Sequence, residues 1–248
     1  MGTDVLQQTT GRVLELTLNR PEAGNAMDAA LIEALIEALD AINGEVCDTV
    51  VFRGAGKGFC GGLDLSVLDS ETDASLLWRL VRIEHLLQKV NALPQETVAF
   101  AHRFSFGAGA DLFIACRRRI AAPGTRFSFP GVRFGIALGT GRLGRRIGPE
   151  AARRLLAATA PISMAEALDT GLVQKEHDVD AWPEIIEALG SQSTSLDAQM
   201  ARIVAERLDP GKDDEDLAAL IRSAGRPGLK DRVANYAAAV AAARKRAG

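Results

Sequence analysis

Aromatic residues, basic charge and long apolar runs are all scarce in this chain of 248 residues. Only 5% of its residues are aromatic and the formal net charge is −3, so it lacks the stacking side chains and the basic surface that nucleic-acid-binding proteins use. No segment holds eighteen uncharged apolar residues, and the opening MGTDVLQQTT lacks the basic and apolar regions of a signal peptide. We therefore expect a cytoplasmic protein with no nucleic-acid and no membrane partner.

Cysteine and histidine are also rare, with three of each. Cys47, Cys60 and Cys116 are odd in number, far apart and set in apolar surroundings, which argues against a disulfide framework. The histidines show no metal-ligand spacing. The sequence predicts buried cysteines that pack as small hydrophobic residues, and it indicates no metal site.

Apolar residues make up 47% of the chain, which is enough for one sizeable core. Strand patterns alternate with helical periodicity in the first half, an order typical of an α/β fold with crossover helices. From about residue 140 onward we predict helices and no further strands. The predicted strands are 11–20, 48–54, 96–104, 117–122 and 125–131, and the predicted helices are 27–43, 74–94, 107–116, 149–159, 163–173, 182–191, 196–208, 215–224 and 230–246.

The stretch GTGRLG, residues 139–144, matches the glycine pattern of a dinucleotide-binding turn. That pattern needs a strand before it and an acidic residue on a following strand. The elements predicted after 139–144 are helices, and no following strand supplies the acidic residue. We therefore expect no nicotinamide cofactor there.

Two other glycine-rich stretches share one design, in which a strand ends in small residues and turns toward a helix. They are GKGFCGGLDL, residues 56–65, and FGAGADL, residues 106–112. Glycine in ordered structure costs about 0.5–1 kcal/mol relative to alanine, so such clusters indicate that something approaches the backbone closely. A tight turn is the simplest explanation. Backbone N–H groups from two such turns that face one point would form an oxyanion hole.

The order and spacing of these motifs resemble those of the crotonase family, the enoyl-CoA hydratases and isomerases. The resemblance rests on NRPEAGNAMD (19–28), GKGFCGGLDL (56–65), FGAGADLFIAC (106–116) and RIAAPGTRFSFPGVRFGI (119–136), followed by a helical C-terminal part. It implies a spiral of ββα units and assembly as homotrimers or hexamers. It also implies an acyl-CoA substrate, with coenzyme A bound as part of the thioester and no separate cofactor. We place the spiral core at 1–190 and the helical region at 191–248.

The same resemblance assigns the catalytic positions. The backbone N–H groups of Leu63 and Ala108 would hold the thioester oxygen, and Asp111 would act as acid or base where the family usually has glutamate. Ala108 stands where glycine is common, which leaves its N–H available. Asp64 matches a position that usually caps the following helix. The residues expected to contact substrate are Asn25, Ala26, Met27, Gly61, Gly62, Asp64, Phe104, Pro130 and Gly131.

The departure from the family pattern is Gly131, which stands where hydratases carry a second carboxylate. Asp111 would then work alone, or it is merely a solvated or helix-capping aspartate. Glu84 and His85 lie on a helix from which some relatives supply an acid or a histidine, although a solvated face is the alternative. His102 and Arg103 replace a usual Asn-Gly pair and are candidates for narrowing the acyl pocket or for an ion pair.

These residues predict an acyl-CoA enzyme of the enoyl-CoA hydratase/isomerase type, of the kind found in fatty acid metabolism. It would act through a thioester enolate that the oxyanion hole stabilises. Isomerisation, decarboxylation and C–C cleavage each need a single proton-transfer group, so the loss of the second carboxylate leaves all of them open. The alternative is a protein of the same fold that binds coenzyme A with little or no catalysis.

Overall fold

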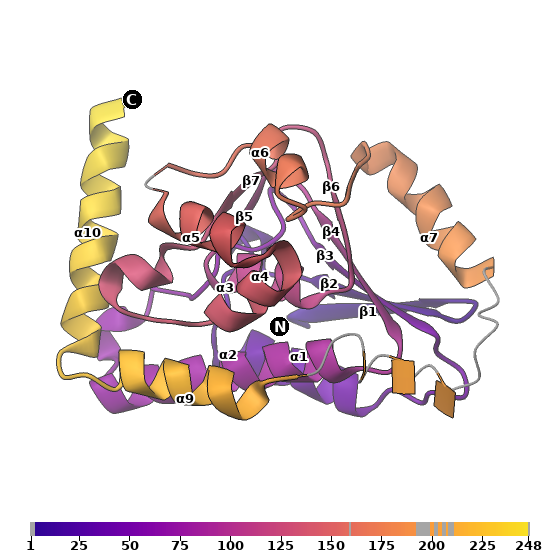
Figure 1. Cartoon of the computed structure of the whole chain (residues 1–248), viewed down its shortest axis with the longest axis horizontal. Coiled ribbons are helices and arrows are strands. Elements are labelled where there is room, and N and C mark those ends of the chain that lie inside the picture. The colour runs from indigo at the N-terminus through magenta and orange to yellow at the C-terminus, as the bar shows by residue number, and fades with distance from the viewer. Residues whose placement is uncertain are drawn as a thin grey trace.

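A computed structural model of the chain describes residues 3–158, 160–191 and 211–247, together with residues 199, 200, 203, 204 and 207. Strands and helices alternate through the first half and helices follow in the second, as the sequence predicts (Figure 1). The helix predicted over 196–208 falls largely outside the described residues. Among the described residues, no helix is long and apolar enough to cross a membrane.

The main sheet has six strands in the order β1-β2-β3-β4-β6-β8. The strand β1 runs antiparallel to β2, and the pairs that follow, from β2 to β8, are parallel. A second sheet pairs β5 with β7. The strands are β1 (Val5–Thr10), β2 (Val13–Leu18), β3 (Thr49–Gly54), β4 (Glu96–Ala101), β5 (Phe104–Phe106), β6 (Arg118–Ala121), β7 (Arg126–Ser128) and β8 (Lys175–Glu176).

The structure corrects two sequence predictions about strands. The first is the strand β1, which was not predicted because five of its six residues are exposed and carry no buried apolar alternation. The second is β8, two residues that pair with Ile120 and Ala121 of β6, so strands do not cease at residue 140.

Most helices begin and end within a few residues of the predicted positions, but α4 was not among the predicted helices and α6 ends earlier than predicted. Thr72 caps α2, because its side chain accepts a hydrogen bond from the Ser75 N–H in a capping box. Asp28 caps α1 in the same manner through Leu31. The helices are α1 (Ala29–Asp40), α2 (Asp73–Ala92), α3 (Ala108–Ala115), α4 (Thr140–Ile147), α5 (Pro149–Ala157), α6 (Met164–Asp169), α7 (Trp182–Ser191), α9 (Asp213–Ala224) and α10 (Leu229–Ala247).

Buried residues alternate along the sheet strands and divide the core into two sides. Val51 and Phe100 pack with Trp182 and Ile186 of α7 on one face. Phe52, the neighbour of Val51 on β3, belongs to the larger core cluster on the other face, which holds residues of α1, α2 and α3. A period of two therefore sends successive side chains of one strand to opposite layers.

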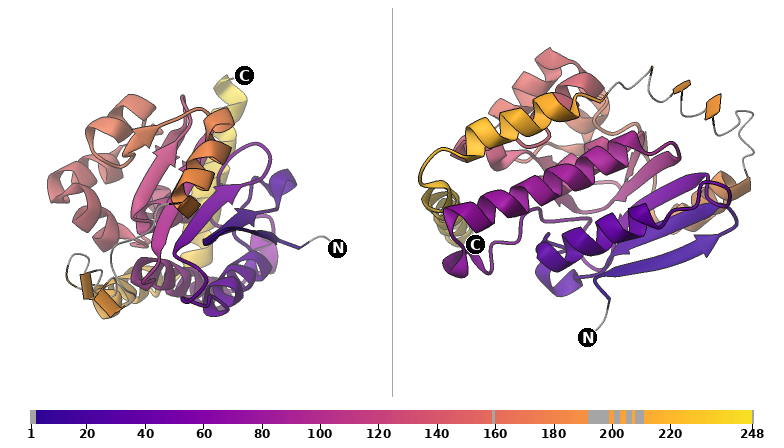
Figure 2. Two further views of the ribbon diagram at one scale, coloured as in Figure 1. Left: turned by 90° about the vertical axis from the view of Figure 1, so that its right-hand side faces the viewer. Right: turned by 90° about the horizontal axis from the view of Figure 1, so that it is seen from below.

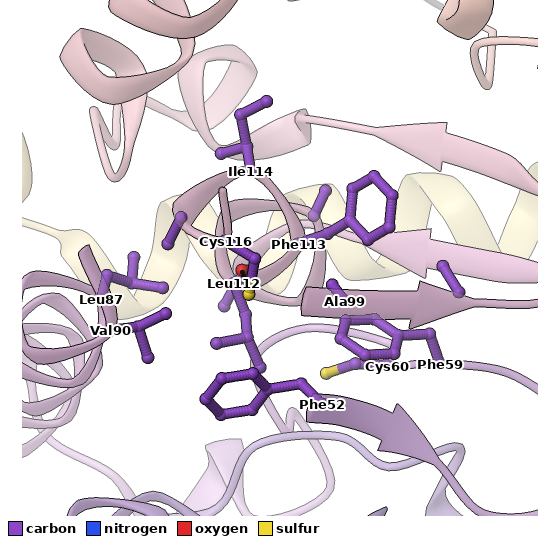
Figure 3. Packing of buried hydrophobic residues seen from close by; sticks show 14 of the residues in the cluster. Phe52, Phe59, Cys60, Leu87, Val90, Ala99, Leu112, Phe113, Ile114 and Cys116 are labelled. Carbon is purple, nitrogen blue, oxygen red and sulfur yellow. Dashed lines mark hydrogen bonds between the residues drawn. The ribbon is translucent and has the colours of Figure 1, made fainter. Parts of the chain in front are cut away.

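The helix α3 is fixed by its apolar side chains. Figure 3 shows Leu112 and Phe113 of α3 among Phe52, Phe59 and Leu87. The rings of Phe59 and Phe113 meet edge to face, with centroids 6.1 Å apart. Because α3 carries Ala108 and Asp111, this packing sets the position of both candidate site residues.

The C-terminal helices return to the core of the same chain. The helix α9 lies alongside α2 in the view from below, and α10 stands at the end of the molecule (Figures 1 and 2). The Asp73 carboxylate accepts hydrogen bonds from the backbone N–H groups of Gly228, Leu229 and Lys230, and so caps the start of α10. A carboxylate at the start of α2 thus positions the last described helix.

Candidate active site

Two glycine-rich turns come together at one end of the sheet. A Cβ atom on Gly62 would lie 2.6 Å from the Phe106 carbonyl oxygen and 3.3 Å from the Ala108 nitrogen, so glycine alone fits between the turns. The backbone of Gly62 is in the left-handed region with φ +93°. The two turns are therefore in direct contact at Gly62 and Ala108, and an oxyanion hole made by the Leu63 and Ala108 N–H groups stays a prediction.

The hydrogen-bond pattern leaves both proposed donors available. Met27 donates its N–H to the Gly62 carbonyl and accepts from the Asp64 N–H, so Leu63, which lies between them, directs its own N–H away from Met27. Ala108 is the first residue of α3, where a helix offers no acceptor for the N–H. Neither N–H donates to another described residue.

The side chain of Asn25 fixes the first glycine-rich turn, residues 56–65. Asn25 is fully buried, and its Nδ2 donates to the carbonyl oxygens of Ala55, Gly58 and Phe59 at 2.8, 2.9 and 3.1 Å. The turn is further closed by the Cys60 thiol, which donates to the Asn25 carbonyl oxygen. Asn25 therefore holds the glycine loop with its side chain, and the contacts of Asn25, Ala26 and Met27 with substrate stay a prediction.

A cavity of about 320 Å³ opens beside the two donors. The loop after β3, the start of α3, the 3₁₀ helix Pro130–Phe134, the start of α4 and one side of α10 form its wall, which is mostly apolar. Such a cavity, with few polar groups, is typical of a small-molecule site. The predicted residues among its lining are Gly61, Leu63, Ala108, Asp111, Pro130 and Gly131.

Asp111 carries the one carboxyl group among the described residues that line the cavity. Its side chain is 4% exposed and its Oδ1 has no hydrogen-bond partner. Burial raises the pKa of Asp111 well above its usual value, the nearby Arg142 guanidinium opposes that rise, and the Glu84 carboxyl adds to it. Asp111 is thus neither a solvated nor a helix-capping aspartate, and its pKa is displaced in the direction that a general acid/base needs.

Asp111→Asn is expected to stabilise the fold at neutral pH. A folded-state pKa above the unfolded one means that wild-type stability is complete below the unfolded pKa and is lost as pH rises toward the folded pKa. Asparagine does not titrate, so the stability of the variant relative to wild type should be constant below the unfolded pKa, at about pH 3 or lower, and should increase as pH rises toward neutral. Urea unfolding at both pH values measures this, and an equal difference at both would contradict it.

Gly139 keeps Asp111 in place. A Cβ atom at Gly139 would lie 2.2 Å from Asp111 Oδ1, and the backbone there is left-handed with φ +63°. The carboxyl group therefore rests directly against the residue that precedes α4.

Gly139→Ala is expected to displace the Asp111 carboxyl and to cost 10²-fold or more in turnover, because small misplacements of an acid/base group are this expensive. Gly148→Ala at the C-terminal end of α4 is the matched control, since Gly148 also has a positive φ, +83°, and a Cβ there meets nothing within 4 Å. Acyl-CoA turnover and thermal melting of both variants measure the effect. Equal activity in the two variants would show that the contact is unimportant.

Glu84 is buried and ion-paired, and it does not line the cavity. Its Oε1 accepts from Arg142 Nη2 at 2.9 Å and from Gln88 Nε2 at 3.2 Å. Arg142 also approaches Asp216 of α9, at 3.6 Å, and Arg145 pairs with the same carboxylate. Glu84 is therefore not on a solvated helix face, and it acts on Asp111 through charge across a buried network.

His85 and His102 lie away from the cavity lining. The His85 ring contacts Arg82, which is paired with Glu33 of α1. His102 lies against Trp182 of α7, with ring centroids 5.8 Å apart, and its Nε2 lies 2.9 Å from the Gly56 carbonyl oxygen. Neither histidine narrows the cavity, and Arg103 next to His102 is exposed.

The expected cap at Asp64 is wrong. Asp64 caps no helix, because the 3₁₀ helix Leu68–Ser70 begins after Val67 and α2 starts at Asp73 with Thr72 as its cap. Burial opposes ionisation of Asp64, but hydrogen bonds from Ser66 and Arg20 hold its pKa below the usual value. Asp64 closes the turn after the glycine cluster and does not line the cavity.

Phe104 does not line the cavity as expected, and Gly131 lines it at a confined position. Phe104 stacks on Phe106 with centroids 5.5 Å apart and covers Gly58, and Phe106 rather than Phe104 lines the cavity. Gly131 does line it, but a Cβ there would lie 3.0 Å from the Ile136 carbonyl oxygen. Restoring a carboxylate with Gly131→Glu therefore requires the Ile136 backbone to move.

Sequence reasoning missed several residues of the site. They include Leu65, Leu80, Phe106, Gly107, Ser128, Phe129, Val132, Phe134, Ile136, Leu138, Thr140, Leu156 and the α10 residues Val233, Tyr236, Ala237, Val240 and Ala241. Most carry no chemical signal, and tertiary folding alone brings them to the cavity. Gly139 and Thr140 belong to GTGRLG, which the glycine pattern marked without indicating the correct role.

Comparisons with known proteins show which family and fold this chain shares. The family model for enoyl-CoA hydratase/isomerase matches residues 8–213. A putative enoyl-CoA hydratase/isomerase from Bordetella parapertussis superposes with a TM-score of 0.92 at 38% identity, covering 96% of this chain and 99% of that one. This match extends over nearly the whole length of both chains.

Two curated relatives match a shorter part. A probable enoyl-CoA hydratase from Bacillus subtilis is 33% identical over 168 residues, which is 65% of this chain and 64% of that protein. The mitochondrial Delta(3,5)-Delta(2,4)-dienoyl-CoA isomerase of Mus musculus is 34% identical over 200 residues, 74% of this chain and 61% of that protein. The chain thus covers less than two thirds of the length of either relative.

The superposition on the Bordetella parapertussis structure places the molecule in the crotonase fold class. The chain belongs to the enoyl-CoA hydratase/isomerase family.

Proposed function

We propose that this chain is an acyl-CoA enzyme of the enoyl-CoA hydratase/isomerase type that works through a thioester enolate. The observation that carries the proposal is the contact between Gly62 and Ala108, which brings two available N–H donors together beside a cavity with one buried carboxyl. Family membership supports the substrate class. Coenzyme A enters as part of the thioester, and no separate cofactor is proposed.

The chemistry needs one proton-transfer group. The N–H groups of Leu63 and Ala108 bind the thioester oxygen and stabilise the negative charge that develops when the α-C–H bond breaks. The Asp111 carboxylate takes the α-proton, and the bond electrons move onto the thioester oxygen. In isomerisation of a 3-enoyl thioester, the protonated Asp111 then gives its proton to the γ-carbon, and the double bond moves next to the carbonyl.

The raised pKa of Asp111 suits this role. A more basic carboxylate removes a carbon-bound proton more readily than an ordinary one, and burial supplies that basicity. The rate should therefore fall as pH decreases through the raised pKa, because only the ionised form accepts the proton. Decarboxylation or C–C cleavage of a related acyl-CoA uses the same hole and the same single group.

Substrate tests separate catalysis from binding alone. Calorimetry with acetoacetyl-CoA is expected to show binding, and a panel of acyl-CoA thioesters followed by mass spectrometry identifies the reaction. Deuterium exchange at the thioester α-carbon, followed by NMR, measures enolate formation directly. Binding without any exchange or turnover would favour a catalytically silent protein, and no binding at millimolar ligand would count against the proposal.

The assembly is expected to be a homotrimer or a hexamer, as the family resemblance implies. The outer side of α10 and the exposed Ile221 of α9 are free of contacts within the described chain that would bury them. Light scattering at micromolar concentration measures the mass in solution. A monomer under these conditions would contradict the prediction.

A further inference from the structure

A buried ion pair lies near Asp111 without lining the cavity. The side chains of Arg142 on α4 and Glu84 on α2 are each 1% exposed, and Arg142 Nη2 donates to Glu84 Oε1 at 2.9 Å. Arg142 Nη2 also lies 3.6 Å from a carboxylate oxygen of Asp216 on α9. The guanidinium of Arg142 is therefore held at one place by acidic groups from two other helices.

Fold stability alone gives little reason for these two charges. Arg142 Nε and Nη1 and Glu84 Oε2 are covered by protein and have no hydrogen-bond partner among the described residues. Removing charged groups from water is costly, and the attraction within a buried pair repays that cost only when the remaining polar atoms are also bonded. An apolar pair of similar volume would often hold the helices together equally well.

The charge of Arg142 acts on Asp111 from α4. Gly139, against which the Asp111 carboxyl rests, directly precedes α4, and Arg142 follows it by about one helical turn. Within this buried region the Arg142 guanidinium lowers the pKa of Asp111, the Glu84 carboxylate raises it, and the effect of Arg142 is the larger of the two. Among the described residues, Arg142 is the one cation with this effect on Asp111.

The other charged side chains of this region act on Arg142 or on one another rather than on Asp111. They are Asp213 and Asp216 of α9 and Arg145 of α4. Tyr236 is the other titratable side chain that lines the cavity, and tyrosine is uncharged below about pH 9. The ion pair is therefore the source of the charge that the Asp111 carboxyl experiences.

We propose that Arg142 is a positioning residue for the reaction, because its guanidinium, anchored by Glu84, is the fixed countercharge that allows Asp111 to act as a base. This inference rests on the proposed function. Burial alone favours a protonated Asp111 carboxyl, which cannot accept the α-proton. The positive charge of Arg142 opposes that tendency without contacting the substrate. Glu84 weakens the effect of Arg142, so that the Asp111 carboxylate stays basic enough to remove a carbon-bound proton.

The pH dependence of α-deuterium exchange into butyryl-CoA tests the two charges separately. Glu84→Gln removes the negative charge, so the midpoint of the rate should move to lower pH, and the rate at high pH should fall because a less basic carboxylate removes protons more slowly. Arg142→Gln should move the midpoint to higher pH. Each displacement should be at least about 0.5 pH unit. Arg142→Lys keeps the charge and should return the midpoint toward that of wild type.

A double variant and a matched control complete the experiment. If Arg142→Gln alone does not fold, Glu84→Gln combined with Arg142→Gln leaves two amides that can pair, and its midpoint should still lie above that of wild type because Arg142 has the larger effect. Glu15→Gln is the control, since Glu15 is a buried glutamate 3.2 Å from Arg53 and has no charge effect on Asp111. Its midpoint should equal that of wild type.

The outcomes distinguish failure of the proposed function from failure of this inference. Absence of α-exchange in wild type would overturn the proposed function and any catalytic use of Arg142. A ¹³C NMR titration of the Asp111 carboxyl, assigned with Asp111→Asn, measures the same displacements without any reaction. Unchanged midpoints in folded variants, or movement in the same direction for Glu84→Gln and Arg142→Gln, would overturn the role of Arg142. A purely structural pair would lower the melting temperature and leave the midpoints where they are.

Discussion

Asp111→Asn is expected to slow α-proton exchange about 10²- to 10⁴-fold, the usual worth of a positioned general acid or base. Asparagine has nearly the same shape as aspartate, so the cavity should keep its form while the proton acceptor is lost. Binding of acetoacetyl-CoA should change far less than exchange does. Exchange into butyryl-CoA, followed by NMR, measures the step without any later chemistry.

The matched control for this substitution is Asp180→Asn. Asp180 is exposed on a 3₁₀ helix next to α7, so its substitution makes the same chemical change outside the cavity. Its exchange rate should equal that of wild type. Unchanged exchange in Asp111→Asn would move the catalytic role to another group, whereas fast hydration by wild type would show that one carboxyl suffices.

Gly62→Ala is expected to disable the oxyanion hole and to reduce kcat/KM by about 10²- to 10³-fold or more. The added Cβ would lie 2.6 Å from the Phe106 carbonyl oxygen and 3.3 Å from the Ala108 nitrogen. The two turns must then separate, and the two N–H donors can no longer converge on one oxygen. Steady-state turnover of the best substrate from the acyl-CoA panel provides the measurement.

Gly124→Ala is the control that separates the contact of Gly62 with Phe106 and Ala108 from the effect of backbone strain. Gly124 also has a left-handed backbone, with φ +72°, but a Cβ there meets nothing within 4 Å. Both alanines therefore carry similar backbone strain, of the order of 1 kcal/mol, and differ in what the methyl group contacts. Similar activity in the two variants would mean that the Gly62–Ala108 contact does not shape the hole.

Most helices and strands could be predicted because the residues that define each of them are neighbours in the sequence. The helix α2 is amphipathic over twenty residues and carries a capping box, and β3 and β4 are short apolar runs. The strand β1 lacks such a signal, since its partner β2 supplies the hydrogen bonds and solvent covers most of its side chains. The prediction that Asp64 caps a helix was wrong because an aspartate that closes a turn can lie in the same local sequence as one that caps a helix.

The candidate site divides in the same way. Leu63, Ala108 and Asp111 were found because glycines mark the backbone approaches around them and a family resemblance fixes the order. Thr140 and the α10 residues were not found, since nothing local says that α4 and α10 face α3. The burial and ion pairing of Glu84 could not be predicted either, because its buried partner Arg142 is 58 residues away in sequence.

Under the proposed function, the wall that α10 contributes to the cavity would govern which acyl group fits, while the proposed reacting groups lie on other elements. Ala237 and Ala241 present small side chains to the cavity, and α10 carries neither the proposed donors nor the proposed acid/base. Exchanging these alanines for larger or smaller residues would shorten or lengthen the space for the acyl group while the reacting groups on α3 stay where they are. Substitutions on α10 would thus change which acyl chain length is accepted without changing the positions of the proposed catalytic groups on α3.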